Sequence, residues 1–321
     1  MSAAGGAVAP VLVLGGTGHY GRRIVAALVA QGVPARVLTR DPARARLALG
    51  DGPETVPGDL EDRAALARAV AGVRAVVVAV SAFQRGQYRR LREIERDGVL
   101  GAVEQARAAG VRRLVYLSGY DRPRAAGAFA EIGAMAEIGR IKAEVEDALV
   151  ATDLDWTVLG LCPSMELFFS LLRGDRLIAP GGGPPALPTV SAVDVGAIGA
   201  EAALRDDLGR QRFRVVGPRA LSFAEAARIL AEATGRPIRV RAVPLLPFRL
   251  GYALLRPFSP YLAAAVSLPL ALARFPEEVA AGAAADHRRL QETFHYPPTS
   301  LADEARRRFG ARRGLRSTSG Q

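Results

Sequence analysis

Short apolar runs alternate with segments of helical apolar spacing throughout the first half of the chain. The runs predict strands over 11–14, 35–39, 54–57, 75–80, 113–117 and 156–159. The segments between them predict helices over 20–30, 42–49, 62–70, 94–109 and 138–150. Strands that alternate with helices at this spacing form parallel βαβ units. The pattern therefore predicts an α/β fold with a doubly wound parallel sheet.

The pattern becomes less regular beyond residue 160. A strand is expected over 213–216, Ser222 and Glu225 have the spacing of a capping box, and residues 245–310 are mostly of helical pattern. We therefore expect two parts, 1–160 and a smaller, mostly helical 161–321. From about 311 the chain is rich in arginine and ends in small polar residues, so this tail is expected to fray.

The single cysteine and the apolar segments limit where the protein is expected to work. Cys162 has no partner for an internal disulfide and residues 1–10 lack the basic segment of a secretory signal, which favours a reducing, cytoplasmic location. The apolar stretch 257–273 is shorter than the roughly 20 residues that span a bilayer and contains Pro260 and Pro269. We expect no membrane span, and within 245–275 a buried helix pair is favoured over a peripheral membrane contact.

The net charge of +11 is unevenly distributed. Six arginines lie between 306 and 316, which leaves +5 for the rest of the chain. Phe309 is the only aromatic residue among them, so the stacking platform of single-strand binders is missing. Neither a helix-turn-helix motif nor zinc-ligand spacing is present elsewhere. The sequence therefore predicts no nucleic-acid partner and no metal site.

A glycine-rich turn follows the first predicted strand and opens the first predicted helix. Gly15, Gly18 and Gly21 have the spacing that permits a tight turn, close backbone approach to a pyrophosphate and close packing of helix on strand. The helix N-terminus adds backbone N–H groups and a positive dipole end. In this context the turn predicts a Rossmann-type sheet with a dinucleotide site. Its expected cofactor-binding residues are Gly15, Thr17, Gly18, His19, Tyr20, Gly21 and Arg22.

The residue at the end of the second predicted strand favours NADPH over NADH. NAD sites usually place Asp or Glu there to hold the ribose hydroxyls, whereas an Arg accommodates the 2′-phosphate of NADP. Here the strand ends at Arg40, whose guanidinium can bind a phosphate through paired hydrogen bonds, with Arg22 as a second arginine nearby. Asp41 could reach a ribose instead, although Pro42 after it favours a helix cap. NADP(H) is therefore the predicted cofactor, with NAD(H) as the alternative.

Asp59 and Leu60 follow the third predicted strand. A carboxylate at that edge can accept a hydrogen bond from the amino group of adenine. The alternative is that Asp59 caps the helix over 62–70, a role that Asp62 also fits. We expect Asp59 and Leu60 to border the adenine.

Several stretches together resemble the NmrA-like proteins of the atypical short-chain dehydrogenase/reductase family, which include isoflavone-reductase-like enzymes and NAD(P)H-dependent quinone reductases. These stretches are 15–21, 37–40, 57–60, 114–118, the helix that carries Lys142, and 155–159. The resemblance extends to about residue 235. It implies a Rossmann domain with a smaller, helical substrate-binding part, and it implies that Val80 and Ser81 border the nicotinamide ribose.

Lys142 is the only lysine among the 43 lysine and arginine residues, which indicates that a compact ammonium is needed there. By resemblance it takes the place of the lysine in the family's Tyr-x-x-x-Lys pair, but Ile138 replaces the tyrosine. An ion pair with Glu146, one turn on, is the structural alternative for Lys142. Ser118 and Tyr120 are the other catalytic candidates. Ser118 lies at the C-terminal end of the fifth predicted strand, where such folds bind ligands; the alternative is that it only caps the end of the strand.

Two functions are consistent with these residues. One is an oxidoreductase that transfers hydride from NADPH to a small apolar carbonyl, enone or quinone, the cofactor supplying the chemistry. The other is a non-catalytic NADPH-binding redox sensor or assembly subunit, which the missing tyrosine favours. Epimerisation of a sugar nucleotide, a third function of the wider family, normally needs that same tyrosine.

Overall fold

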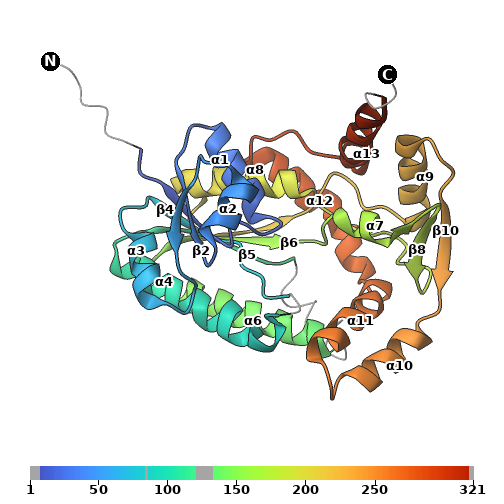
Figure 1. Cartoon of the computed structure of the whole chain (residues 1–321), viewed down its shortest axis with the longest axis horizontal. Coiled ribbons are helices and arrows are strands. Elements are labelled where there is room, and N and C mark those ends of the chain that lie inside the picture. The colour runs from blue at the N-terminus through green and yellow to red at the C-terminus, as the bar shows by residue number, and fades with distance from the viewer. Residues whose placement is uncertain (1–7, 84–85, 121–132, 318–321) are drawn as a thin grey trace. The chain divides into compact units, whose positions relative to one another are not determined.

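The computed structural model describes residues 8–83, 86–120 and 133–317, and these ranges contain two sheets (Figure 1). The larger sheet has seven strands in the order β3-β2-β1-β4-β5-β6-β9. Its strands are β1 (Val11–Leu14), β2 (Ala35–Thr39), β3 (Glu54–Pro57), β4 (Ala75–Val78), β5 (Arg113–Gly119), β6 (Asp155–Leu161) and β9 (Gln211–Val215). β1 pairs in parallel with both β2 and β4, so the strand order changes direction at β1. Ligands of doubly wound sheets bind at such a switch point.

Helices cover both faces of this sheet. They are α1 (Gly21–Ala30), α2 (Pro42–Leu49), α3 (Arg63–Val70), α4 (Val99–Ala108), α6 (Gly133–Val150) and α8 (Ala192–Leu204). In Figure 1, α1, α2 and α8 lie on one side of the sheet, and α3, α4 and α6 lie on the other. A Cβ on Gly199 of α8 would come within 3.0 Å of the Ile24 side chain of α1, so these two helices pack closely. The predicted Rossmann fold class is confirmed.

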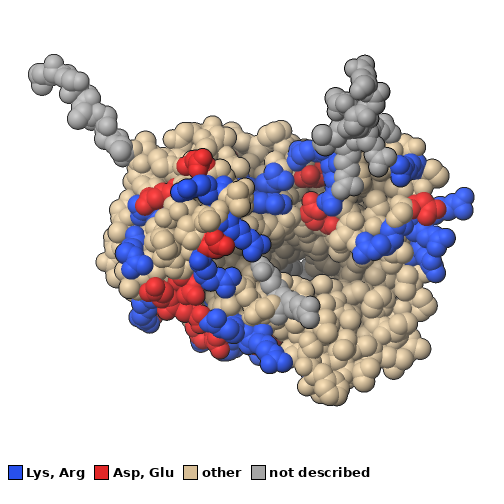
Figure 2. Space-filling model, in the orientation of Figure 1, with Lys and Arg blue, Asp and Glu red and all other residues tan. Residues whose placement is uncertain are grey.

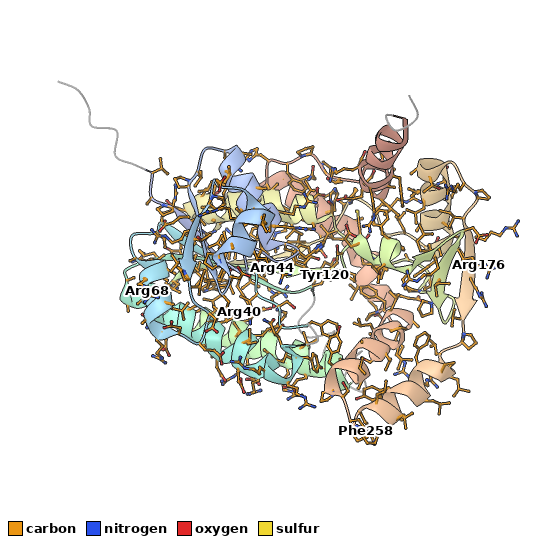
Figure 3. All side chains as sticks on the ribbon, in the orientation of Figure 1. Arg40, Arg44, Arg68, Tyr120, Arg176 and Phe258 are labelled. Carbon is orange, nitrogen blue, oxygen red and sulfur yellow. The ribbon has the colours of Figure 1, made fainter. Side chains whose placement is uncertain are left out.

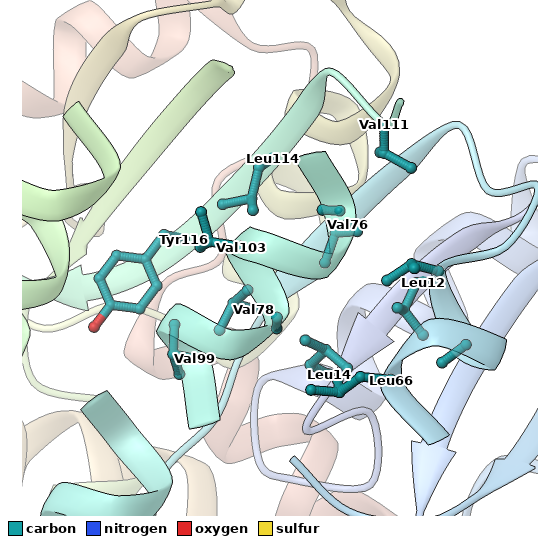
Figure 4. Packing of buried hydrophobic residues seen from close by; sticks show 14 of the residues in the cluster. Leu12, Leu14, Leu66, Val76, Val78, Val99, Val103, Val111, Leu114 and Tyr116 are labelled. Carbon is teal, nitrogen blue, oxygen red and sulfur yellow. The ribbon is translucent and has the colours of Figure 1, made fainter. Parts of the chain in front are cut away.

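The central strands β1 and β4 are continuous apolar runs because the middle of the sheet is buried on both faces. All four residues of β1 are fully buried. Figure 4 shows the face that α3 and α4 cover. Side chains packed there include Leu12, Leu14, Leu66, Val76, Val78, Val99, Val103, Leu114 and Tyr116.

Besides α8, the second half of the chain contains a small sheet and six α-helices within the described residues. The sheet has the order β10-β8-β7, with strands β7 (Leu172–Arg173), β8 (Arg176–Pro180) and β10 (Arg239–Val243). The helices are α7 (Glu166–Leu171), α9 (Phe223–Thr234), α10 (Leu246–Leu255), α11 (Pro260–Ala273), α12 (Glu277–Thr293) and α13 (Leu301–Ser317). The sequence pattern did not predict this sheet, because β7 is very short and β10 exposes four of its five residues.

The chain forms two compact units that exchange segments. The first unit comprises 1–118, 141–160 and 195–213, and the second comprises 119–140, 161–194 and 214–321. Residue 160, the predicted boundary, is one of the points where the chain passes between them. The observed units are interleaved rather than contiguous because 195–213 returns to the large sheet with most of α8 and the start of β9.

Three local expectations differ from the structure. The helix predicted over 94–109 begins as a six-residue π-helix, Glu93–Gly98, before α4. α13 continues to Ser317, so the backbone over 311–317 is helical where fraying was expected; arginine, alanine and leucine are strong helix formers. Residues 245–275 form the predicted pair of helices, but only α11 has buried residues; α10 has none. No helix in the described ranges is long and apolar enough to cross a membrane.

The predicted capping box of α9 is confirmed and allows a stability test. The Glu225 backbone N–H donates to the Ser222 hydroxyl at 3.2 Å, and the Ser222 backbone N–H donates to the Glu225 carboxylate at 2.9 Å. Ser222→Ala is expected to lower the free energy of unfolding by about 1 kcal/mol, measured by urea denaturation. Arg228→Ala, at an exposed position of the same helix, is the control and should change it by less than about 0.5 kcal/mol.

Candidate cofactor-binding site

The turn between β1 and α1 is built from contacts that only glycine permits. Gly15 has a φ of +77°, and a Cβ there would lie 2.5 Å from the carbonyl oxygen of Ala79, just after β4. The Gly18 backbone N–H donates to the Gly15 carbonyl at 2.9 Å. Gly21 packs against the same carbonyl so closely that a Cβ would collide with it. This is the tight turn with close helix packing that a dinucleotide site requires.

The start of α1 is suited to an anion. Tyr20 occupies the N-cap position without a side-chain cap hydrogen bond, and the first turn contains no acidic residue. The positive end of the helix dipole is therefore not neutralised by a carboxylate of this helix. The arrangement fits the pyrophosphate of a dinucleotide. His19 and Tyr20 stack edge to face in the turn, with ring centroids 4.7 Å apart, while Thr17 and Arg22 are exposed.

Arg40 lies at the C-terminal end of β2, beside the start of α2 (Figure 3). Its guanidinium nitrogens lie 2.9 and 2.5 Å from the side-chain amide of Gln87, whose oxygen, when it faces Arg40, can accept from both. Asp41 caps α2, because its carboxylate accepts from the Arg44 backbone N–H at 2.9 Å. The structure thus gives Asp41 the helix-cap role and leaves arginine, not an acid, at this edge of the sheet.

Asp59 and Leu60 lie in the turn after β3. The Asp59 carboxylate accepts from the backbone N–H groups of Glu61 and Asp62, at 3.0 and 3.2 Å. Asp62 caps α3 by accepting from Ala65 at 2.9 Å. The cap alternative for Asp59 is therefore wrong, and its contact with adenine stays a prediction.

Lys142 projects from α6 into a buried cluster. Its ammonium lies 3.2 Å from the Glu95 carboxylate and 5.5 Å from the centre of the Tyr116 ring. Glu95 is 2% exposed, and its other oxygen accepts from the Ala82 backbone N–H at 2.7 Å. Burial lowers the pKa of Lys142, but Tyr116 and the Glu95 carboxylate raise this pKa by more, so its net direction is upward. Lys142 is therefore held as an ammonium at neutral pH.

Sequence reasoning missed Glu95 because the π-helix changes which side of the segment faces inward. In a regular α-helix, Glu95 is expected on the solvent-exposed face, because its neighbours Arg92, Glu93 and Arg96 are also charged. The widened turn Glu93–Gly98 instead buries Glu95 next to the segment after β4. That segment holds Val80 and Ser81, so one carboxylate connects it to Lys142. Single π-turns recur at functional sites.

Glu146 does not pair with Lys142, so the structural alternative for the lysine is wrong. Glu146 is 3% exposed, accepts from the Ser118 hydroxyl and lies 3.1 Å from the Arg212 guanidinium of β9. Ser118 is itself buried and directs its proton to this carboxylate. Lys142 and Glu146 are one turn apart on α6 but belong to separate groups. Lys142 pairs with Glu95, and Glu146 pairs with Ser118 and Arg212.

Tyr120 belongs to the second compact unit, whereas Lys142 and Ser118 belong to the first. Its hydroxyl donates to the Asp286 carboxylate of α12 at 2.7 Å, and the Arg214 guanidinium lies 5.9 Å from its ring centre. Burial, together with the hydrogen bond to Asp286, raises the pKa of Tyr120 well above its ordinary value. The phenol therefore stays protonated, with its proton directed at a carboxylate. Its catalytic role stays a prediction.

Comparison with known proteins agrees with this geometry. A family model described as NAD(P)H-binding matches residues 15–165. The (4-alkanoyl-5-oxo-2,5-dihydrofuran-3-yl)methyl phosphate reductase of Streptomyces griseus is 31% identical over 232 residues, covering 71% of this chain and 75% of that protein. NAD(P)H azoreductase of Xenophilus azovorans is 28% identical over 240 residues, covering 73% and 77%. Photosystem II assembly factor Ycf39 of Synechocystis is 26% identical over 244 residues, covering 74% and 72%.

Among solved structures, the NADPH complex of the Escherichia coli NADPH-dependent quinone oxidoreductase superposes with a TM-score of 0.66. Its sequence is 21% identical, and the match covers 93% of this chain and 99% of that one. At this identity the match supports the fold. Together with the family model and the relatives, it confirms the resemblance stated above. The chain belongs to the NAD(P)H-binding, NmrA-like proteins of the atypical short-chain dehydrogenase/reductase family.

The close contact between Gly15 and Ala79 predicts that a side chain at Gly15 weakens cofactor binding. Gly15→Ala would place a Cβ against Ala79 and is expected to weaken NADPH binding by at least about tenfold, measured by fluorescence titration. Gly32→Ala is the matched control, because Gly32 also has a positive φ, of +71°, but a Cβ there meets nothing within 4 Å. It should cost stability without changing affinity. Equal affinity loss in both variants would contradict the role of the turn; circular dichroism checks that each variant is folded.

Proposed function

We propose that this protein is an NADPH-dependent oxidoreductase that reduces a small apolar carbonyl, enone or quinone. The proposal rests chiefly on one juxtaposition: Glu95 joins the ammonium of Lys142 to the segment after β4, in the unit that carries the glycine turn. The bound nicotinamide would supply the hydride. Three of the similar proteins have names of this kind. One is an azoreductase, one reduces an oxo-dihydrofuran methyl phosphate, and one is a quinone oxidoreductase.

The choice of NADPH is supported by the edge of β2. Arg40 is positioned by Gln87, and a guanidinium there can form paired, charge-assisted hydrogen bonds with a 2′-phosphate. Arg44, on the first turn of α2, adds a second positive charge nearby. The neighbouring acid, Asp41, is engaged as the helix cap. An acid that would hold the ribose hydroxyls of NADH is thus missing from the position where NAD sites usually carry it.

Lys142 would bind and orient rather than exchange protons. Its pKa is raised, so at neutral pH it keeps its three N–H donors. The ammonium is ion-paired with Glu95 at 3.2 Å, and its N–H groups can hold ribose hydroxyls. Glu95 acts as a positioning residue, because it fixes the ammonium to the backbone of Ala82.

The proton that completes a reduction would come from water. Ile138 cannot donate one, Ser118 donates to Glu146, and Tyr120 donates to Asp286. This favours acceptors whose reduced product is a delocalised anion, such as quinones and enones, over simple ketones. A simple ketone would give a basic alkoxide that needs a positioned acid in the transition state.

The same observations favour a second candidate, a non-catalytic NADPH-binding sensor or assembly subunit. Ser118 and Tyr120 donate their protons to carboxylates, and Ile138 has no proton to donate. One similar protein is named as an assembly factor. The experiment that separates the two functions is NADPH consumption, followed by absorbance, against a panel of quinones, enones and ketones. Turnover of quinones or enones above ketones supports the proposal; tight NADPH binding without turnover of any acceptor overturns it in favour of the second candidate.

Removing the Arg40 guanidinium is expected to change the preference between NADPH and NADH. Arg40→Ala should weaken NADPH binding about tenfold to hundredfold, because a charge-assisted hydrogen bond to phosphate is lost, and leave NADH binding unchanged. Arg46→Ala, an exposed arginine further along α2, is the control. Fluorescence titration with both cofactors measures the effect. Equal affinity of the wild type for NADPH and NADH would show the argument to be wrong.

The Glu95 pair predicts a shift in pH dependence. Glu95→Gln keeps the shape but removes the Glu95 charge, one of the two contributions, with Tyr116, that raise the pKa of Lys142, while burial, which lowers it, remains. The ammonium is then lost at lower pH, so the alkaline limit of cofactor binding should move to lower pH. Lys142→Met should weaken binding and reduce turnover at every pH. Glu104→Gln, an exposed acid of α4, should leave the profile unchanged; an unshifted profile for Glu95→Gln would rule out its positioning role.

A further inference from the structure

α10 presents a row of exposed leucines. Leu246, Leu250 and Leu254 are 61%, 62% and 67% exposed, and their spacing of four places them along one side of the helix. Phe258, just beyond the helix, is 74% exposed. We call these four residues the α10 stripe. Figure 3 places Phe258 at the turn between α10 and α11, pointing outward.

The opposite side of α10 attaches the helix to the second unit. Leu245 and Phe248 pack against Leu270 and Ala271 of α11. Figure 2 shows the surface over α10 and α11 as a broad area with neither acidic nor basic side chains on the face in view. A row of exposed large apolar side chains on one side of a helix marks a candidate interaction site.

The charged residues of the chain segment that contains the stripe have one sign. From Glu232 to Glu277 the sequence has no acidic residue between these two, but it has six arginines. All six are exposed: Arg236, Arg239, Arg241, Arg249, Arg256 and Arg274. Arg249 follows Leu246 by three residues and therefore flanks the stripe, and Arg256 is the C-cap residue of α10.

We propose that the α10 stripe docks on a membrane surface that contains anionic lipids. α10 would lie in the plane of the interface, with Leu246, Leu250, Leu254 and Phe258 inserted among the acyl chains. Arg249 and Arg256 would contact the lipid phosphates. A helix with leucine and phenylalanine on one side and arginine beside them is the type that binds at such an interface without crossing it.

The same charges disfavour a second copy of the chain as the occupant. Two stripes packed face to face would bring the arginines of both copies together. No acidic residue of this stretch could neutralise them, since the stretch has none. Like charges buried at an interface are destabilising, whereas an anionic lipid surface neutralises them.

The test is flotation of the full chain with vesicles of phosphatidylcholine alone and of three parts phosphatidylcholine to one part phosphatidylglycerol. The wild type should float with the anionic vesicles and not with the neutral ones. Leu250→Glu and Phe258→Glu should each weaken binding at least about tenfold, because a charge enters the apolar interface. Leu47→Glu is the matched control, since Leu47 of α2 is 89% exposed but lies outside the stripe. Arg249→Gln should weaken binding about fivefold.

Three outcomes would overturn the proposal. They are failure of the wild type to float with anionic vesicles, flotation that Leu250→Glu and Phe258→Glu leave intact, and a dimer in sedimentation that Leu250→Glu dissociates without any vesicle binding. The second outcome would assign the lipid contact to the arginines of 306–316 instead. NADPH titration of the same variants should match the wild type, so the result does not depend on the proposed oxidoreductase function.

Discussion

Gly15 fixes the geometry of the cofactor site because backbone from Ala79, Gly18 and Gly21 converges on this residue. A Cβ at Gly15 would strike the segment after β4, and a Cβ at Gly21 would strike Gly15 itself. α1 can therefore begin directly above the end of β1, where the strand order of the sheet changes direction. β2 and β4 flank β1, so the segments that follow them, with Arg40 on one side and Val80 to Ala82 on the other, border the same turn. Without this close approach, neither segment would lie beside the helix N-terminus.

Features that depend on neighbouring residues could be predicted from the sequence. The bounds of β1, β2 and β3, the caps at Asp41 and Asp62 and the capping box at Ser222 all follow from local patterns, and the structure has each of them. The glycine turn belongs to this group, since its strand and helix are adjacent in the chain. Glu95 does not, because its partner Lys142 comes from a different helix and its burial depends on a π-turn. An acid in a charged helical segment gives no sign in the sequence that it is buried.

In the second unit, the hydropathy pattern predicts helices but not whether their apolar sides are buried. Residues 245–275 predict helices correctly, but the apolar character of α10 was taken as a sign of burial, and none of its residues is buried. An apolar side that packs inside its own chain and one that contacts something else have the same sequence pattern. β10 shows the same limit in the other direction, because its exposed, arginine-rich strand lacks the alternation by which strands are predicted.

A chain with forty-two arginines and one lysine has a single side-chain amine. In the folded protein that amine is an ammonium held against Glu95 and is only 19% exposed, so reagents that attack free amines reach it slowly. Its rate of acylation therefore reports how often the Glu95–Lys142 pair opens. The protein thus carries one natural chemical reporter, located within its candidate cofactor site, whose reactivity separates opening of this site from unfolding elsewhere.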